Sequence, residues 1–364
     1  MGFNCGIVGL PNVGKSTLFN AMTKAGVPAA NYPFCTIDAH NAIAFVPDKR
    51  LDDICKILEP KSTVPTTVEF VDIAGLVAGA HKGEGLGNQF LGNIRSVDAI
   101  AHVVRCFEET SVVHQYESVD PIRDIEVITT ELILADLESL AKRFEKTASL
   151  AKIGNKEAQA SLSTLEKIKN HLEQGKAARH TPLDEKERPL LAELNLLTAK
   201  PVLYVLNVNE NDVAHPSEKM KRVIDYAKSD RAEAVLISAS IESELAELSD
   251  EEKKDFLAEM GLTEPGLHRL IRAGYKLLDL TTFFTAGKKE CRAWTIPKGS
   301  TAPQAAGAIH SDFERGFIRA EVFSYDDLMK YGSEAKVKEA GRLRIEGAEY
   351  IVQDGDIMHF RFNV

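Results

Sequence analysis

Short apolar runs alternate with amphipathic stretches over the first 130 residues of the chain. Buried β-strands are expected at residues 3–9, 42–46, 68–73 and 99–106, of which the last three are rich in Val, Ile, Ala and Phe. Strand character returns at residues 201–206 and 233–237. The alternation of such strands with helices predicts an α/β domain.

A purely helical pattern interrupts this domain. Between residues 131 and 172 there is no strand pattern, and apolar residues recur at the spacing of one helix face. They include Leu137, Leu140, Phe144, Leu162 and Leu165. A break at Ile153-Gly154-Asn155 predicts that two long helices fold into an antiparallel hairpin. We therefore expect a helical arm inserted into the α/β domain, which makes that domain discontinuous in sequence.

The end of the chain has a third pattern. After an expected helix at residues 266–280, residues 285–296 suggest a β-hairpin, 302–313 a helix and 317–323 a strand. Residues 350–362 suggest a second hairpin that turns at Asp354-Gly355. These elements predict a small β-rich module around one helix.

Composition excludes several other classes of protein. The chain has 364 residues, of which 44% are hydrophobic and 27% charged, as expected for a folded protein of two or three domains. Its five cysteines form no C-x-x-C pair, so neither a disulfide framework nor a zinc site is expected. The first strand leaves no room for a signal peptide, and no apolar run approaches the roughly 20 residues that span a bilayer. We expect a cytoplasmic protein without membrane contact.

The net charge of −10 is unevenly distributed. Acidic groups exceed basic ones in residues 1–130 and 201–280, whereas residues 131–200 and 281–364 are close to neutral and rich in Lys and Arg. Contact with a polyanion would be least opposed at these two near-neutral segments. A solvated surface of mixed charge explains the same distribution equally well.

The most informative motif is Gly9-Leu-Pro-Asn-Val-Gly-Lys-Ser16, which matches the phosphate-loop pattern G-x-x-x-x-G-K-[ST] and follows the first expected strand. In such a loop backbone N–H groups surround a polyphosphate, the lysine reaches its terminal phosphates, and the Ser hydroxyl ligates Mg²⁺. We expect these residues to bind a nucleoside triphosphate: Asn12, Val13, Gly14, Lys15, Ser16 and Thr17.

A second motif, Asp72-Ile-Ala-Gly75, follows the strand at residues 68–73. An aspartate there is suited to hold magnesium through water, and the N–H group of Gly75 to meet the terminal phosphate. Thr36, between the loop helix and the second strand, is expected to complete the magnesium shell. After Gly75 comes a glycine-rich run that includes Gly79, Gly83 and Gly92, and we expect it to be a switch segment.

Base recognition is expected after the strand at residues 201–206. Related GTPases carry N-K-x-D there, whereas this chain has Asn207-Val208-Asn209-Glu210. Without the lysine, and with a carboxylate one methylene further out, bidentate pairing with guanine should be lost, so adenine becomes competitive. The register Asn209-Glu210-Asn211-Asp212 restores the aspartate and is the GTP-favouring alternative. Ser238-Ala239-Ser240 are expected to form the remaining loop beside the base.

Taken together, the phosphate loop, Thr36, residues 72–75, the Gly-Glu-Gly-Leu-Gly-Asn run at 83–88 and residues 302–306 resemble the Obg-like ATPase (YchF) family of translation-factor-class P-loop proteins. The resemblance covers essentially the whole chain. It implies a Ras-like nucleotide domain (residues 1–130 and 200–280), an inserted antiparallel coiled-coil arm (131–199) and a C-terminal TGS domain of β-grasp form (281–364). It also implies a preference for ATP.

The resemblance leaves the catalytic step less defined. Ras-like GTPases orient water with a glutamine directly after D-x-x-G, but this chain has Leu76, so intrinsic hydrolysis should be slow. Lys15, Thr36 and Gly75 are expected to act on the terminal phosphate. His114 is a candidate for the missing group, as is His81, although an ordinary loop histidine explains either one. Asn12 resembles the asparagine that helps hold K⁺ in related glutamine-lacking hydrolases.

Three functions remain open at this point. The first is a magnesium-dependent, nucleotide-switched ATPase whose arm and C-terminal module bind the ribosome or its RNA and regulate translation or a stress response. The second is an Obg-type GTPase. The third is a binding module in which nucleotide occupancy is the signal and turnover is incidental. No DNA partner is expected for any of them.

Overall fold

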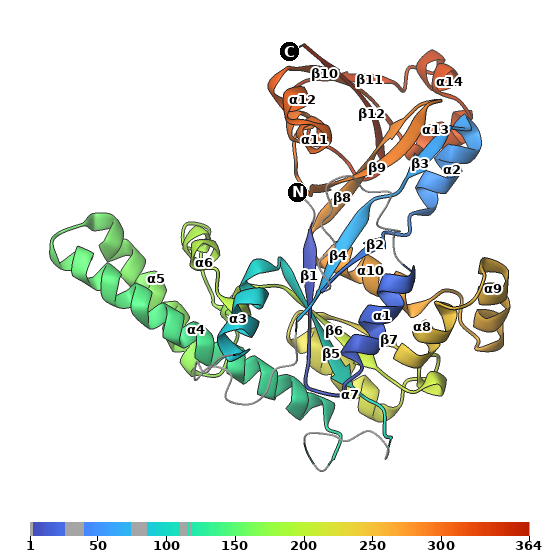
Figure 1. Ribbon diagram of the computed structural model, residues 1–364. Helices are drawn as coiled ribbons and strands as arrows, with labels where there is room; N and C mark the ends of the chain where they lie inside the picture. Colours follow the sequence, from blue (N-terminus) through green and yellow to red (C-terminus); the bar gives the residue numbers. More distant parts are fainter. Residues whose placement is uncertain (1–2, 26–39, 74–85, 110–115, 117, 364) are drawn as a thin grey trace. The chain divides into compact units, whose positions relative to one another are not determined.

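The structure is a computed structural model that describes residues 3–25, 40–73, 86–109, 116 and 118–363. Its contacts divide the chain into two compact units, each discontinuous in sequence (Figure 1). The core unit comprises residues 3–43 and 69–274, and the C-terminal unit comprises residues 44–68 and 275–364. Each unit is described by itself below.

The core unit is built on a six-stranded sheet of strand order β2-β4-β1-β5-β6-β7, within which β4, β1, β5, β6 and β7 run parallel to one another. The strands are β1 (Asn4–Val8), β2 (Asn41–Phe45), β4 (Thr67–Asp72), β5 (Ala99–Arg105), β6 (Val202–Asn207) and β7 (Glu233–Ile237). Every residue of β5 and β6 is buried, as expected for central strands of a parallel sheet. All six strands expected from the apolar runs are therefore present, and the α/β prediction is confirmed.

Outside the arm, the core unit contains the helices α1 (Lys15–Ala25), α3 (Leu86–Ser96), α7 (Glu218–Ser229), α8 (Ala239–Leu245), α9 (Asp250–Glu259) and α10 (Gly266–Leu277), of which α8, α9 and α10 follow β7. The last of them is shorter than the expected helix at residues 266–280, because strand β8 begins at Leu280. Helix α1 begins at Lys15 directly after the phosphate loop, so its amino-terminal end faces the carboxyl edge of the sheet.

The helical arm is a hairpin of α4 (Pro121–Lys152) and α5 (Lys156–Glu173), which run side by side in Figure 1. Asn155 caps α5 by accepting a hydrogen bond from the N–H group of Ala158. Buried apolar residues from both helices form a shared cluster. Helix α4 begins about ten residues before the expected start of the arm, because Asp120 caps it and Pro121 occupies its first turn. None of the helices in the described ranges is long and apolar enough to cross a membrane.

At the base of the arm, the carboxylate of Asp136 accepts hydrogen bonds from the N–H groups of Leu197 (2.7 Å) and Thr198 (2.8 Å). Both residues lie in the 3₁₀ turn Leu197–Ala199, just before β6. The 3₁₀ turn Ala178–His180 and helix α6 (Arg188–Leu194) connect α5 to this turn. Burial raises the pKa of Asp136, while the hydrogen bonds from Thr198 and Leu197 oppose that rise. Asp136 thus connects α4, through which the chain enters the arm, to the segment through which the chain returns to β6.

The C-terminal unit contains a second six-stranded sheet of order β11-β10-β12-β8-β9-β3. Its strands are β3 (Ser62–Val64), β8 (Leu280–Ala286), β9 (Glu290–Pro297), β10 (Phe317–Ser324), β11 (Arg344–Glu346) and β12 (Asp356–Phe362). Its helices are α2 (Lys49–Leu58), α11 (Ala302–Ile309), α12 (Ser311–Arg315), α13 (Tyr325–Tyr331) and α14 (Glu334–Glu339). Most strand pairs are antiparallel, but β12 pairs with β8 in parallel, which gives a mixed sheet.

Three expectations for this unit need correction. The first hairpin is longer than residues 285–296, since β8 and β9 pair from Leu280 to Pro297. The expected helix at 302–313 is divided at His310, which has an extended backbone and caps α12. The second hairpin does not form: Ile351 bridges Thr301, and β12 pairs with β10 and β8 instead. These long-range pairings satisfy backbone groups that a local hairpin would have paired.

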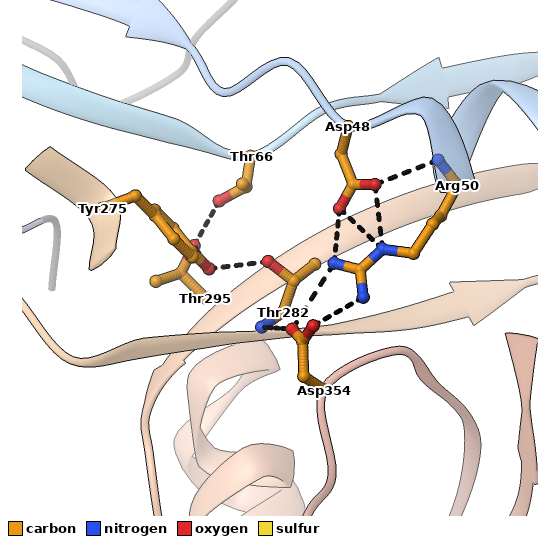
Figure 2. Close-up of polar contacts among 7 residues, drawn as sticks. All are labelled: Asp48, Arg50, Thr66, Tyr275, Thr282, Thr295 and Asp354. Atoms are coloured by element: carbon orange, nitrogen blue, oxygen red, sulfur yellow. Dashed lines mark hydrogen bonds and ion pairs between the residues drawn. The ribbon is translucent and has the colours of Figure 1, made fainter. Parts of the chain in front are cut away.

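Residues 44–68 belong to the C-terminal unit, although the sequence analysis placed them in the nucleotide domain. Strand β3 pairs in parallel with β9, and Leu51 and Ile54 of α2 are buried in a cluster with Phe284 and Phe323. Polar contacts fix the same segment, as Figure 2 shows. Arg50 donates to Asp48 of its own segment (Nη2 to Oδ2, 2.8 Å) and to Asp354 (Nη1 to Oδ2, 2.6 Å).

Candidate nucleotide site

A cavity of about 930 Å³ lies within the core unit at the carboxyl ends of its central strands. It is lined by phosphate-loop residues 12 and 14–17, by residues 207–212 after β6, by residues 239 and 240 after β7, and by residues 107 and 109 after β5. Ligands of open α/β sheets bind at this edge, and the volume suits a nucleotide. The structure therefore brings together the expected phosphate and base motifs.

The phosphate loop has a tightly constrained backbone. Asn12 has a φ of 59° and Gly14 a φ of 97°, both in the left-handed region. A Cβ atom at Gly14 would also collide with the side-chain nitrogen of Asn207. Position 14 thus requires glycine for two independent reasons, its backbone angle and the close approach of Asn207.

Lys15, the first residue of α1, is almost completely buried, with 8% of its surface exposed. Its Nζ atom donates hydrogen bonds to the carbonyl oxygens of Gly9 (3.0 Å) and Leu10 (2.7 Å). Burial lowers the pKa of the Lys15 ammonium group to about 8, and the negative charge of Asp72 opposes that shift. The ammonium group is held within the loop, at the cavity that the loop lines.

Asp72 ends β4, in register with Ile7 of β1. Its Oδ1 atom is buried and has no hydrogen-bond partner among the described residues. Buried carboxylate oxygens are normally paired, so this atom is suited to a bound cation or its water ligands. Ser16, whose side chain is exposed on the cavity, is the second expected oxygen donor. The described residues therefore fit a magnesium ion beside the phosphates.

Asn207, the last residue of β6, connects three segments of the site. Its Nδ2 atom donates to the carbonyl oxygen of Val13 (2.9 Å), and its Oδ1 atom accepts from the N–H group of Ala239 (3.0 Å). The neighbouring Val208 is buried, and its N–H group donates to the carbonyl oxygen of Ile237 (2.9 Å). Because Asn207 rather than Asn209 makes these contacts, the geometry favours the register Asn207-Val208-Asn209-Glu210.

Of the remaining base-side residues, two line the cavity and one is buried. Glu210 and Ser240 line the cavity, and the Ser240 hydroxyl donates to Oε1 of Glu210 (3.2 Å). Ser238 is buried beneath them, and its hydroxyl contacts that of Ser240 (2.9 Å). Asp212 of the alternative register also lines the cavity. The loop after β7 is thus hydrogen-bonded to Glu210, the fourth residue of Asn207-Val208-Asn209-Glu210.

Several expected residues lie outside the described residues: Thr36, Gly75, Leu76, His81 and His114. Conversely, the cavity includes two residues that the sequence analysis did not name, Phe107 and Glu109, and it also includes Asn209 and Asn211, which were named only as members of the base-motif registers. Phe107 and Glu109 carry no motif of their own. The only local indication of their role is that they follow a buried strand of the parallel sheet. The carboxyl end of that strand lies at the same edge of the sheet as the phosphate loop.

Comparison with protein families gives two matches. Residues 4–135 match the MMR_HSR1 family, described as "50S ribosome-binding GTPase". Residues 280–363 match the YchF-GTPase_C family, described as "Protein of unknown function (DUF933)". The two matches cover the first part of the core unit and most of the C-terminal unit.

Full-length relatives are similar over the whole chain. Proteins named "Ribosome-binding ATPase YchF" are 57% identical over 364 residues in Pasteurella multocida, 55% over 366 residues in Bacillus subtilis and 54% over 364 residues in Escherichia coli O157:H7, with 100% of both chains covered in each case. The solved structure of the Schizosaccharomyces pombe YchF GTPase is 38% identical and superimposes with a TM-score of 0.90. That match covers 99% of this chain and 98% of the other.

Proposed function

This chain belongs to the YchF family of P-loop nucleotide hydrolases, and from that premise we propose that it is a slow, nucleotide-switched ATPase that associates with the ribosome. The observation that carries the proposal is the junction at Asn207, which fastens the phosphate loop to the base-side loop within one cavity. A site built this way holds both ends of a nucleotide in fixed relative positions.

In the proposed complex, Lys15 and the amino-terminal end of α1 bind the terminal phosphates of ATP. The ammonium group exchanges its carbonyl partners, Gly9 and Leu10, for phosphate oxygens. Ser16 and Asp72 would hold Mg²⁺, which when bound supplies positive charge that offsets the negative charge of the phosphates. Asn12, which lines the same cavity, is proposed to help hold K⁺. Thr36, Gly75 and His114 keep their expected roles as parts of the proposal.

The base preference is proposed from residues 208 and 210. Val208 is buried and offers no long stem to lie along a base, and the carboxylate of Glu210 accepts a hydrogen bond from Ser240. Neither residue reproduces the guanine contacts of an N-K-x-D motif. An Obg-type GTPase remains the second candidate, because Asp212 also lines the cavity and because the related protein of the solved structure is named a GTPase.

A competition titration of ATP and GTP against the purified protein, read by calorimetry, tests this preference. Tighter binding of ATP, with magnesium-dependent release of phosphate, is the expected result. Equal or tighter binding of GTP would instead favour the second candidate. Binding of ATP without any phosphate release under these conditions would reduce the protein to a nucleotide-dependent binding module.

Ribosome association is proposed from the names of the relatives and from the charge distribution. The arm and the residues from 281 onward are the least acidic parts of the chain, and α5 alone, with 18 residues, is roughly 27 Å long. Lys and Arg side chains that meet ribosomal RNA phosphates would make the association weaken steeply with salt. A cytoplasmic location follows from this proposal.

Co-sedimentation with purified ribosomes, at several salt concentrations and with ATP or ADP, tests the association. Neutralising the arm residues Lys142, Arg143, Lys167 and Lys169, of which Arg143 is half-buried and the others are exposed, should reduce it. All four groups pair with carboxylates: Lys142 with Glu138, Arg143 with Glu193, Lys167 with Glu187 and Lys169 with Glu173. A variant that also removes these four carboxylates therefore separates net charge from the loss of the ion pairs. Unchanged co-sedimentation of the neutralised protein would remove the arm from the proposed interface.

A further inference from the structure

Arg105, the last residue of β5, has a completely buried side chain with an exposed fraction of 1%. Strand β5 lies between β1 and β6 in the centre of the core sheet. A guanidinium group in such a place loses its hydration, which is costly unless hydrogen bonds and aromatic or charged partners replace the water. The role of Arg105 should therefore be found in the groups that it contacts.

Among the described residues, Arg105 contacts the segment that directly follows β5. The Nε atom of Arg105 donates to the carbonyl oxygen of Phe107 (3.2 Å), and Nη2 donates to the carbonyl oxygen of Glu109 (3.1 Å). The central guanidinium carbon lies 4.5 Å from the centre of the Phe107 ring, a distance typical of a cation–π contact. One side chain thus holds two carbonyl groups and one aromatic ring of this segment.

The same segment forms a wall of the nucleotide cavity. Phe107 and Glu109 line it together with the phosphate loop after β1 and the base-side residues after β6. Arg105 is in register with Asn207, and the N–H group of Cys106 donates to the carbonyl oxygen of Asn207 (2.8 Å). Residues 107–109 are therefore attached beside the strand end that carries the base motif.

We propose that Arg105 is a positioning residue that holds the wall formed by residues 107–109 and so sets the affinity of the site for the nucleoside part of its substrate. The inference rests on the proposed nucleotide-binding function and deepens it. Arg105 acts through Phe107 and Glu109, while the phosphates are bound by the phosphate loop. Loss of the guanidinium group should consequently raise KM with little change in kcat, as expected when binding is lost equally from the ground state and the transition state.

The test compares Arg105→Met, which keeps an unbranched apolar stem, with Arg105→Lys, which also keeps a positive charge. Calorimetry measures binding of ATP and of inorganic tripolyphosphate, a probe without base or ribose, and steady-state phosphate release measures KM and kcat. The matched control is Lys228→Ala, which removes an exposed cation of α7 whose Nζ atom lies 3.0 Å from Oδ1 of Asp225.

For Arg105→Met we expect ATP binding to weaken by about tenfold or more, tripolyphosphate binding to stay within about twofold, and kcat to stay within about twofold. Arg105→Lys should lie between this variant and the wild-type protein, because a lysine cannot hold both carbonyl groups in the same geometry. The control should match the wild-type protein in every measurement.

Two results would overturn the proposal: unchanged ATP affinity in Arg105→Met, or equal losses for ATP and tripolyphosphate, which would indicate general damage to the site. Should Arg105→Met fail to fold, Phe107→Leu removes the ring under the guanidinium group and leaves Arg105 in place. That variant is expected to lose ATP affinity selectively, and unchanged affinity would again overturn the proposal. A wild-type protein that binds tripolyphosphate but no nucleotide would refute the proposed function instead.

Discussion

The side-chain amide of Asn207 donates a 2.9 Å hydrogen bond to the carbonyl oxygen of Val13. This contact joins the end of β6 to the middle of the phosphate loop, two segments that are 194 positions apart in the sequence. The second polar atom of the same side chain accepts from Ala239, at the start of α8. Since Asn207 is only 4% exposed, its function in this geometry is to connect the loops that form the cavity.

Asn207→Ala should therefore weaken triphosphate binding through the loop rather than through the base. The variant leaves the Val13 carbonyl and the Ala239 N–H group without this partner, at a cost of about 1–3 kcal/mol for buried groups. We expect ATP, GTP and tripolyphosphate to lose affinity by similar factors in calorimetry. A loss confined to one nucleotide would mean that Asn207 reads the base directly.

The double variant Val208→Lys, Glu210→Asp restores the residues of a guanine-reading motif. Its expected effect is a shift of nucleotide preference toward GTP, because the lysine stem is added beside the base and the carboxylate is drawn back by one methylene. Competition calorimetry with the wild-type protein measures the shift. As a control, Glu210→Lys restores the lysine of the alternative register Asn209-Glu210-Asn211-Asp212, and a larger shift toward GTP in that control would show that Asn209 begins the motif.

The pKa of Lys15, lowered by burial to about 8 against an ordinary value of 10.5, predicts a pH dependence. The charged ammonium form binds phosphate, so ATP affinity should be constant below about pH 7 and fall as the pH rises through 8. Between the lowered pKa of Lys15 in the folded protein, about 8, and its ordinary pKa of 10.5, the unfolded chain binds more protons than the folded chain. The stability of the ligand-free protein should therefore rise with pH between these two values.

Calorimetry across pH 6.5 to 9.5, values chosen to span roughly one to two units on each side of this pKa, measures the affinity. Lys15→Ala should lose useful binding and phosphate release altogether. Lys15→Arg is the matched control, because its guanidinium group does not titrate in this range and any remaining affinity should be independent of pH. A flat profile for the wild-type protein would show that Lys15 stays fully charged.

Potassium should accelerate phosphate release relative to sodium if Asn12 helps hold K⁺. Asn12 lines the cavity and has a left-handed backbone, which places it at the turn of the phosphate loop. A cation there would supply positive charge to the phosphates. Phosphate release in matched chloride salts tests the effect, and Asn12→Ala should abolish the difference between the salts. Identical rates for the wild-type protein in the two salts would remove the cation role.

Arg50→Met should destabilise the C-terminal unit. Arg50 links Asp48, before α2, to Asp354, before β12, and breaking such a partly buried pair costs about 1–3 kcal/mol. Urea unfolding followed by the fluorescence of Trp294, the single tryptophan of the chain, reports on this unit. Lys56→Met on the same helix is the control, because the Lys56 side chain is exposed and its pair with the partly buried Asp53 should contribute little. Equal midpoints for the two variants would contradict the role of Arg50.

The sequence by itself determined those features whose determinants are contiguous. The phosphate loop, the strands of the core sheet and the reversal between α4 and α5 are each encoded within a few residues by glycine positions, apolar runs or a helix cap. The same holds for the base motif, whose preferred register the contacts of Asn207 support. Local backbone preferences and burial patterns are sufficient to specify such elements.

Only the tertiary structure decided which distant segments share a unit or a site. Residues 44–68 lie between two expected nucleotide motifs in sequence, yet their contacts join the C-terminal unit, where Arg50 meets Asp354 across 304 positions. In the same way, Arg105 and Phe107 were an unremarkable strand end until the sheet order placed them between the phosphate loop and the base motif. The physical reason is that periodicity records which face of an element is buried, whereas the partner that buries it is chosen by packing and hydrogen bonding over the whole chain.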